Sequence, residues 1–119
     1  MKRDRFDAIC GAMTGAHNVI QWGDASVWKV GGAKGPVFAI HSHWGPVEGV
    51  VLKPSEMARE IWRDAPGVAL APYLGRAGWI KIDEGAMGEG DLIALIEGSY
   101  AINAGKLTKK ARAELGIPG

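Results

Sequence analysis

The stretch that decides the fold runs from residue 19 to residue 53 and reads VIQWGDASVWKVGGAKGPVFAIHSHWGPVEGVVLK. It holds four segments rich in valine, isoleucine, phenylalanine and tryptophan, which favour β-strands. The segments cover residues 19–22, 26–30, 37–43 and 47–53 and are joined by GDA, GGAKGP and WGP. Because a parallel crossover needs a dozen or more residues, such short links predict neighbouring antiparallel strands.

Alternation along these segments predicts which side chains share a face of the sheet. Successive side chains in a strand point to opposite faces. We therefore expect Trp28 and Val30 on one face, with Val27 and Lys29 on the other. By the same period, Phe38 and Ile40 should face one way.

Helices are predicted on both sides of this stretch. Residues 3–13 form a first helix, whose apolar stripe is Phe6, Ile9, Cys10 and Met13. Ser55 is the expected N-cap of a second helix, which Pro66-Gly67 ends. Its apolar face should carry Met57, Ile61 and Ala65, with Ala58 and Trp62 beside them.

The C-terminal part continues with strands and then helices. Residues 69–71 predict a short strand and residues 79–83 a clearer one, with Trp79 and Lys81 on a partly wet face. Tyr73 should close the turn at Pro72 against the sheet. Asp91 is expected to cap a long helix, and Thr108 a last short one that ends at Gly116.

The order is therefore helix, four strands, helix, one or two strands and two helices. Hairpin-linked strands with helices set apart from them indicate an α+β fold. We expect a single antiparallel sheet of five to six strands, with helices packed on one face and the other face partly wet. A length of 119 residues indicates a single domain, residues 1–119.

Composition narrows the class of protein. Hydrophobic residues make up 47% and charged residues 23%, as in globular domains. No apolar run approaches the ~20 residues that cross a bilayer, so we expect no membrane partner. The start MKRDRFD has no apolar signal core, and the only cysteine is Cys10; both favour a cytoplasmic location. A net charge of +1 does not indicate a strong DNA binder.

Several segments together resemble the MmcQ/YjbR family, also called DUF419. They are FDAIC, QWGDASVWKVGG, PVFAI, LKPSEMAREI, PGVALAPYLGRAGWIKID and LIALIEGSYAINAGKLTKKARAEL, in this order over nearly the whole chain. The resemblance implies a small α+β domain likened to double-wing DNA-binding domains and to secretion-chaperone-like folds. It implies DNA binding and brings no established catalytic site. This chain departs from the family in a longer loop at 31–36 and in His41 and His43.

His41 and His43 are the candidates for a metal site. Residues i and i+2 of a strand share a face, so both imidazoles could meet one ion. Further ligands would have to come from His17 or Glu48, and no spacing fixes either. Two surface histidines near a polar strand are the simpler interpretation, and we expect no bound metal.

Enzymatic activity and cofactors are not expected. The glycine-rich stretches VGGAKGP and GAMGEG match neither the dinucleotide fingerprint nor a phosphate loop. No nucleophile elbow and no HExxH pair occur, and the carboxylates cluster in the loop at 83–91. The sequence therefore predicts no catalytic residue and no cofactor.

Two binding roles stay open. In the first, cations on the open face and at loop tips contact nucleic-acid phosphates, weakly and with steep salt dependence. In the second, the chain binds a protein or a small ligand and has no affinity for nucleic acid. The positions of the five tryptophans argue against one shared stacking platform. The expected phosphate contacts are Lys29, Lys34, Lys53, Arg76 and Lys81.

Overall fold

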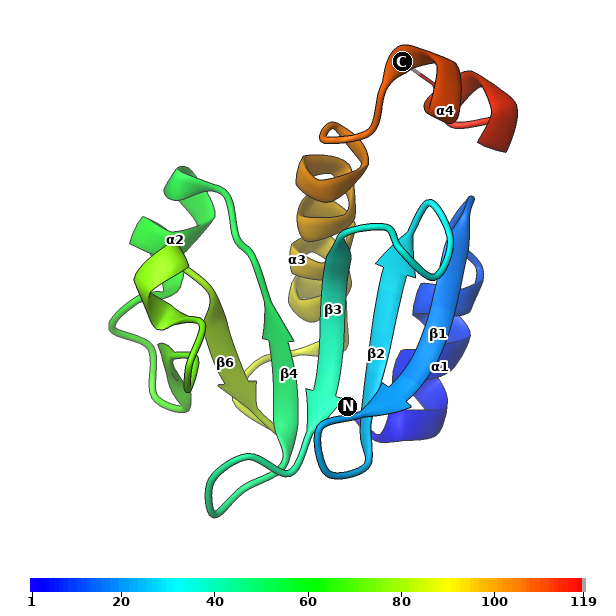
Figure 1. Cartoon of the computed structure of the whole chain (residues 1–119). Coiled ribbons are helices and arrows are strands. Elements are labelled where there is room, and N and C mark those ends of the chain that lie inside the picture. Colours follow the sequence, from blue (N-terminus) through cyan, green and yellow to red (C-terminus); the bar gives the residue numbers. More distant parts are fainter. Residues whose placement is uncertain (119) are drawn as a thin grey trace.

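One antiparallel sheet of six strands forms the centre of the molecule (Figure 1). The computed structural model describes residues 1–118. The strands lie in the order β1-β2-β3-β4-β6-β5, so the short strand β5 is at one edge and β1 at the other. The predicted α+β class and the antiparallel order of the first four strands are confirmed. The strands are β1 (Ala16–Gln21), β2 (Ala25–Val30), β3 (Val37–Ser42), β4 (Gly49–Leu52), β5 (Val68–Leu70) and β6 (Ile80–Asp83).

Four helices and one 3-10 turn accompany the sheet. Figure 1 shows α1 and α3 on the same side of the strands, and both contact β2 and β3. This confirms that the main helices cover one face. The elements are α1 (Arg3–Gly11), α2 (Glu56–Trp62), the turn η1 (Gly75–Ala77), α3 (Glu89–Ala104) and α4 (Lys109–Leu115).

Two of the three predicted helix caps are confirmed. The Ser55 hydroxyl accepts a hydrogen bond from the backbone N–H of Ala58, and the Thr108 hydroxyl accepts one from Ala111. The third prediction is wrong, since α3 begins at Glu89 with Gly88 as its N-cap. Asp91 lies in the first turn, where its charge complements the helix dipole.

A β-bulge in β3 changes the alternation that the sequence predicts. Trp28 pairs with Ala39, but the next residue, Lys29, pairs with Val37, so Phe38 is an extra residue. Phe38 consequently lies in the core under the helices, whereas Ile40 lies in a second core on the opposite face. The expectation that these two side chains face one way is therefore wrong.

The face away from α1 and α3 is partly covered by the segment 71–79. Val27, Ile40 and Val51 are fully buried there, and Ala71, Leu74, Trp79 and Trp44 pack around them. Val19 and Val37 remain partly exposed at the side of β1. This second core is small, so one face carries two helices and the other a single loop.

Helix α2 does not bury the apolar face that its sequence suggests. Met57 and Ile61 are 76% and 68% exposed, whereas Ala58 and Trp62 pack against the core. The helix spans only Glu56–Trp62, and none of its residues is fully buried. Met57 and Ile61 therefore lie on an apolar face of the helix that is exposed, and the helix packs through its neighbouring side.

Polar side chains fix the two main helices to the sheet. The buried Ser99 hydroxyl of α3 donates to the Phe38 carbonyl (2.6 Å) and accepts from the Lys53 backbone N–H (3.0 Å). The Asp7 carboxylate of α1 accepts from the Ser26 hydroxyl (2.6 Å) and the Trp28 indole (2.9 Å). These bonds link α3 to β3 and β4, and α1 to β2.

None of the helices formed by residues 1–118 is long and apolar enough to cross a membrane.

Replacing Ser99 with alanine should destabilise the fold. The change leaves a buried carbonyl and a buried N–H without their partner, which costs about 2–4 kcal/mol of unfolding free energy. Chemical denaturation of Ser99→Ala measures this loss. Glu97→Ala, on the exposed side of α3, is the control. A loss below about 0.5 kcal/mol would contradict this account of the bulge.

Candidate binding site

Three aromatic side chains from three separate turns surround a hollow on the face opposite the main helices. Trp22 follows β1, Trp44 follows β3 and Tyr73 follows β5. Their ring centroids are 6.1 Å apart for Trp22 and Trp44, and 6.2 Å apart for Trp44 and Tyr73. Together with Leu74 they line a volume of about 430 Å³, which we call the aromatic hollow. Trp22 and Trp44 meet in this hollow, whereas Trp28 and Trp62 pack against the core under the helices, so the five tryptophans share no common platform, as predicted.

The backbone holds two of these aromatics in an unfavourable conformation. Trp22 has φ 54° and Tyr73 has φ 66°, in the left-handed region that bulky residues avoid. Trp22 is 51% exposed and Tyr73 is 93% exposed, so burial of the rings does not offset this strain. Tyr73 therefore does not close its turn against the sheet as predicted. Strain without packing is typical of binding positions.

A second, polar pocket is lined by the turn η1 and by the start of α2. It has a volume of about 310 Å³, and Lys53, Arg59 and Arg76 bring positive charge to it. The Lys53 ammonium donates a hydrogen bond to the carbonyl of Ala77. We call this the basic pocket. Its lining residues are Lys53, Pro54, Ser55, Glu56, Arg59, Arg76, Ala77, Gly78 and Ile102.

The five predicted phosphate contacts are distributed over three places. Lys53 and Arg76 meet in the basic pocket. Lys34 is exposed in the loop between β2 and β3, and the Lys29 ammonium donates to the Ala33 carbonyl of that loop (2.9 Å).

Lys81 is not on a wet face, contrary to the prediction. It is only 7% exposed, and its ammonium group contacts the Asp83 carboxylate (2.7 Å) and the Val47 carbonyl (2.5 Å). The second core and the segment 71–79 cover this face of the sheet. Lys81 is therefore an internal ion-pair partner and does not reach a phosphate from this position.

The two candidate metal ligands occupy different environments. His41 is buried and its ring lies 5.5 Å from that of Phe6, whereas His43 is exposed. The Nδ1 atom of His43 lies 3.4 Å from Glu48, so this carboxylate does approach one of the histidines. Within residues 1–118, no three histidine, cysteine, aspartate or glutamate side chains are grouped to hold a metal ion.

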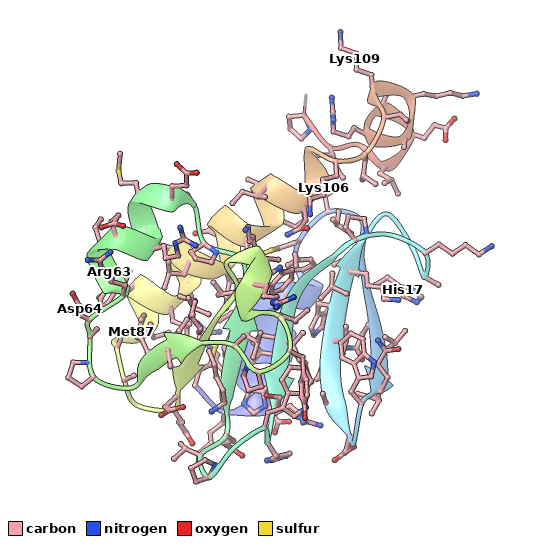
Figure 2. All side chains as sticks on the ribbon, turned by 60° about the vertical axis from the view of Figure 1, so that its left-hand side comes forward. His17, Arg63, Asp64, Met87, Lys106 and Lys109 are labelled. Atoms are coloured by element: carbon pink, nitrogen blue, oxygen red, sulfur yellow. The ribbon has the colours of Figure 1, made fainter. Side chains whose placement is uncertain are left out.

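His17 is too far away to complete such a site. It pairs with Lys29 across β1 and β2, whereas His41 pairs with Ser26 across β2 and β3. Because Lys29 and Ser26 differ by an odd number of positions along β2, the two histidines lie on opposite faces of the sheet. Figure 2 shows His17 beside β1.

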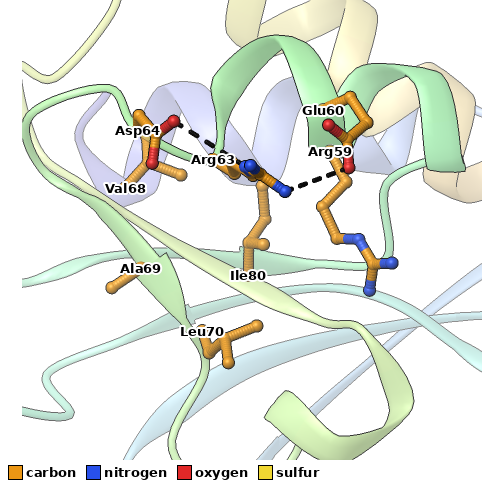
Figure 3. Close-up of a pocket in the computed structure, with 8 residues that line it drawn as sticks. All are labelled: Arg59, Glu60, Arg63, Asp64, Val68, Ala69, Leu70 and Ile80. Atoms are coloured by element: carbon orange, nitrogen blue, oxygen red, sulfur yellow. Dashed lines mark hydrogen bonds and ion pairs between the residues drawn. The ribbon is translucent and has the colours of Figure 1, made fainter.

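A third hollow lies between α2 and β5 (Figure 3). Its volume is about 300 Å³, and Val68, Leu70 and Ile80 give it apolar walls. Arg59 also lines it, while its other charges are paired, Arg63 with Glu60 (3.3 Å) and Asp64 (3.7 Å). Figure 3 shows the Arg59 guanidinium pointing away from these ion pairs.

The basic run at residues 106–112 does not line any of these three hollows. Figure 2 shows Lys109 pointing outward from α4, and both Lys109 and Lys110 are exposed. Its lysines are therefore solvated, whereas the Arg112 guanidinium donates hydrogen bonds to the carbonyls of Gly105 and Leu107.

The fold is that of a small α+β domain, with helices on one face of the sheet and an aromatic hollow on the other. Comparison with known families makes this more specific. The YjbR family matches residues 11–102, and the chain belongs to this family.

Solved structures agree with this assignment. The Deinococcus radiodurans protein DR2400, which carries a DUF419 domain, superposes with a TM-score of 0.82 at 25% identity. The match covers 97% of this chain and 88% of that one. A Pseudomonas syringae protein has the same fold, with a TM-score of 0.72, 19% identity and coverage of 87% and 99%. No curated protein matches the chain.

Replacing Tyr73 tests whether its backbone is strained. Glycine adopts a positive φ freely, whereas alanine does so only at a cost. We expect Tyr73→Gly to be about 1 kcal/mol more stable than Tyr73→Ala, despite the greater flexibility of unfolded glycine. Denaturant unfolding compares the two variants. A more stable alanine variant would show that the backbone moves out of the left-handed region.

Stability should depend on pH through His41. Burial lowers the pKa of its imidazole, although a contact with the Met1 carbonyl acts in the opposite direction. The unfolded chain therefore takes up a proton at a higher pH than the folded protein does. The unfolding free energy should fall as the pH is lowered through 6.5, until the folded His41 is also protonated.

The control for this pH dependence is the neighbouring exposed histidine. Denaturation at a series of pH values would compare His41→Asn with His43→Asn. The first variant should lose this part of the pH dependence and the second should keep it. An unchanged slope in His41→Asn would assign the effect to other groups.

Proposed function

We propose that this chain is a non-enzymatic DNA-binding module of the cytoplasm, which takes unpaired bases into the aromatic hollow. The observation that carries the proposal is the convergence of Trp22, Trp44 and Tyr73 on an open hollow. Flat bases stack on such rings regardless of sequence. A strand with unpaired bases fits this site better than a closed duplex, whose bases are already stacked.

Charge supports a weak and salt-dependent interaction. The net charge is only +1, but Lys53, Arg59 and Arg76 gather in the basic pocket, which the same segment 71–79 helps to line. Tyr73 and Arg76 are three residues apart, so their Cα atoms are at most about 11 Å from each other. A short strand can therefore place a base in the hollow and a phosphate near these cations.

The second candidate is a protein- or small-ligand-binding module without affinity for nucleic acid. It is favoured by the net charge of only +1, which gives a phosphate backbone little electrostatic attraction to the chain. In this case the hollow would hold an apolar or aromatic group of the partner.

A salt titration with oligonucleotides separates the two roles. We expect binding of a fluorescent single strand of about 12 nucleotides, tighter than binding of the matching duplex. The slope of log K against log salt should be about −2 to −4, for three to five phosphate contacts. Fluorescence anisotropy measures both quantities. No binding at low salt, or a slope near zero, would favour the second candidate.

Removal of one ring tests the hollow itself. Tyr73→Ala should weaken single-strand binding by about 5- to 150-fold, which corresponds to the binding free energy lost when one base no longer stacks on an aromatic ring. Because Tyr73 is 93% exposed, its loss should leave the folded core intact. Met57→Ala removes a side chain that is 76% exposed on α2 and should leave binding unchanged. Equal affinities of both variants and the parent would place the bound bases elsewhere.

A further inference from the structure

We propose that the basic pocket is a binding site for a phosphate group. The inference names the phosphate subsite of the binding site proposed above, and it depends on that proposal only for the source of the phosphate. The shared chemistry is an anionic phosphate group, supplied either by a nucleic-acid backbone or terminus, or by free phosphate. The cations concerned are Lys53, Arg59 and Arg76.

Two of these cations converge on one empty point. A Cβ atom built on Gly78 would lie 2.8 Å from the Lys53 Nζ atom and 2.9 Å from an Arg59 Nη atom. The two nitrogens are therefore no more than about 6 Å apart. Like charges at this separation repel each other, and an anion between them removes the repulsion.

The cations have no carboxylate partner within the described chain. Among residues 1–118, no aspartate or glutamate oxygen lies within 4.0 Å of the charged groups of Lys53, Arg59 or Arg76. Glu56 is the single carboxylate residue that lines the pocket. Three positive charges against one negative leave an excess that suits an anionic phosphate group.

Arg63 shows the contrast on the same helix. Its guanidinium contacts both Glu60 and Asp64, and Figure 3 shows Arg59 turned away from this cluster. Arg63, at the C-terminal end of α2, is thus neutralised within the chain. Arg59, one turn earlier, has no such partner and is left for an external anion.

Gly78 keeps the space between the cations open. Its φ of 85° lies in the left-handed region, and any side chain would enter the gap between Lys53 and Arg59. Glycine is therefore required at this position for two reasons: it adopts the left-handed backbone conformation, and it leaves the gap between the two cations empty. It leaves a volume of about 310 Å³ in which an anion can approach both cations.

The donors suit phosphate geometry. An arginine guanidinium can bind two phosphate oxygens through parallel N–H groups, and lysine adds a point charge. The Lys53 ammonium has three donors, of which one bonds to the Ala77 carbonyl and two are left for an anion. The Ser55 hydroxyl contributes little, because it already caps α2.

The test is an NMR titration of the full chain with inorganic phosphate at constant ionic strength. The amide signals of Ala77 and Gly78 should shift and saturate. Arg59→Gln and Arg76→Gln should each weaken phosphate binding at least about tenfold, the value of a charge-assisted hydrogen bond. Arg63→Gln removes the same charge from the same helix outside the pocket and should bind like the parent. The proposal would be overturned if the chemical shifts did not saturate, or if all three variants lost phosphate affinity equally.

A competition experiment identifies the source of the phosphate. If a 5′-phosphorylated single strand displaces inorganic phosphate, the pocket is the phosphate subsite of the nucleic-acid site. If phosphate binds with saturation and no oligonucleotide binds, the pocket stands as a free-phosphate site and the DNA-binding proposal fails. If the oligonucleotide binds equally to the parent and to Arg59→Gln, and phosphate does not bind, the pocket proposal fails and DNA binding stands.

Discussion

The hydrogen bonds of Ser99 to β3 and β4 are the constraint on which the rest of the structure depends. The bulge at Phe38 breaks the ladder between β2 and β3, and the Ser99 hydroxyl satisfies the Phe38 carbonyl at that point. The same oxygen accepts the Lys53 N–H at the end of β4. One buried hydroxyl of α3 therefore fixes the helix to both central strands.

The bulge also gives the two faces of the sheet different roles. It directs Phe38 toward the helices and Ile40 toward the opposite face, where Val27 and Val51 join it. This second core is too small to need a helix, and the segment 71–79 is enough to cover it. The rings of Trp44 and Tyr73 meet above this face and leave the aromatic hollow open.

Much of the fold could be predicted because short-range rules decide it. Loop lengths determine the antiparallel order, and Ser55 and Thr108 mark helix starts by a local hydrogen bond. The bulge could not be predicted, because it depends on a serine about sixty positions further along the chain. The candidate site was predicted only in part. Lys53 and Arg76 were identified, but the turns that bring Trp22 to Trp44, and the burial of Lys81, depend on tertiary packing.

The segment 71–79 links the two pockets covalently, since Tyr73 and Leu74 line the aromatic hollow and Arg76 to Gly78 line the basic pocket. The spacing between them is set by the short turn η1 and not by a hinge between domains. Under the proposed function, this segment fixes the distance between the ring and the anion of a ligand that occupies both pockets. Insertions or deletions here would change which ligands fit without altering any side chain that touches them.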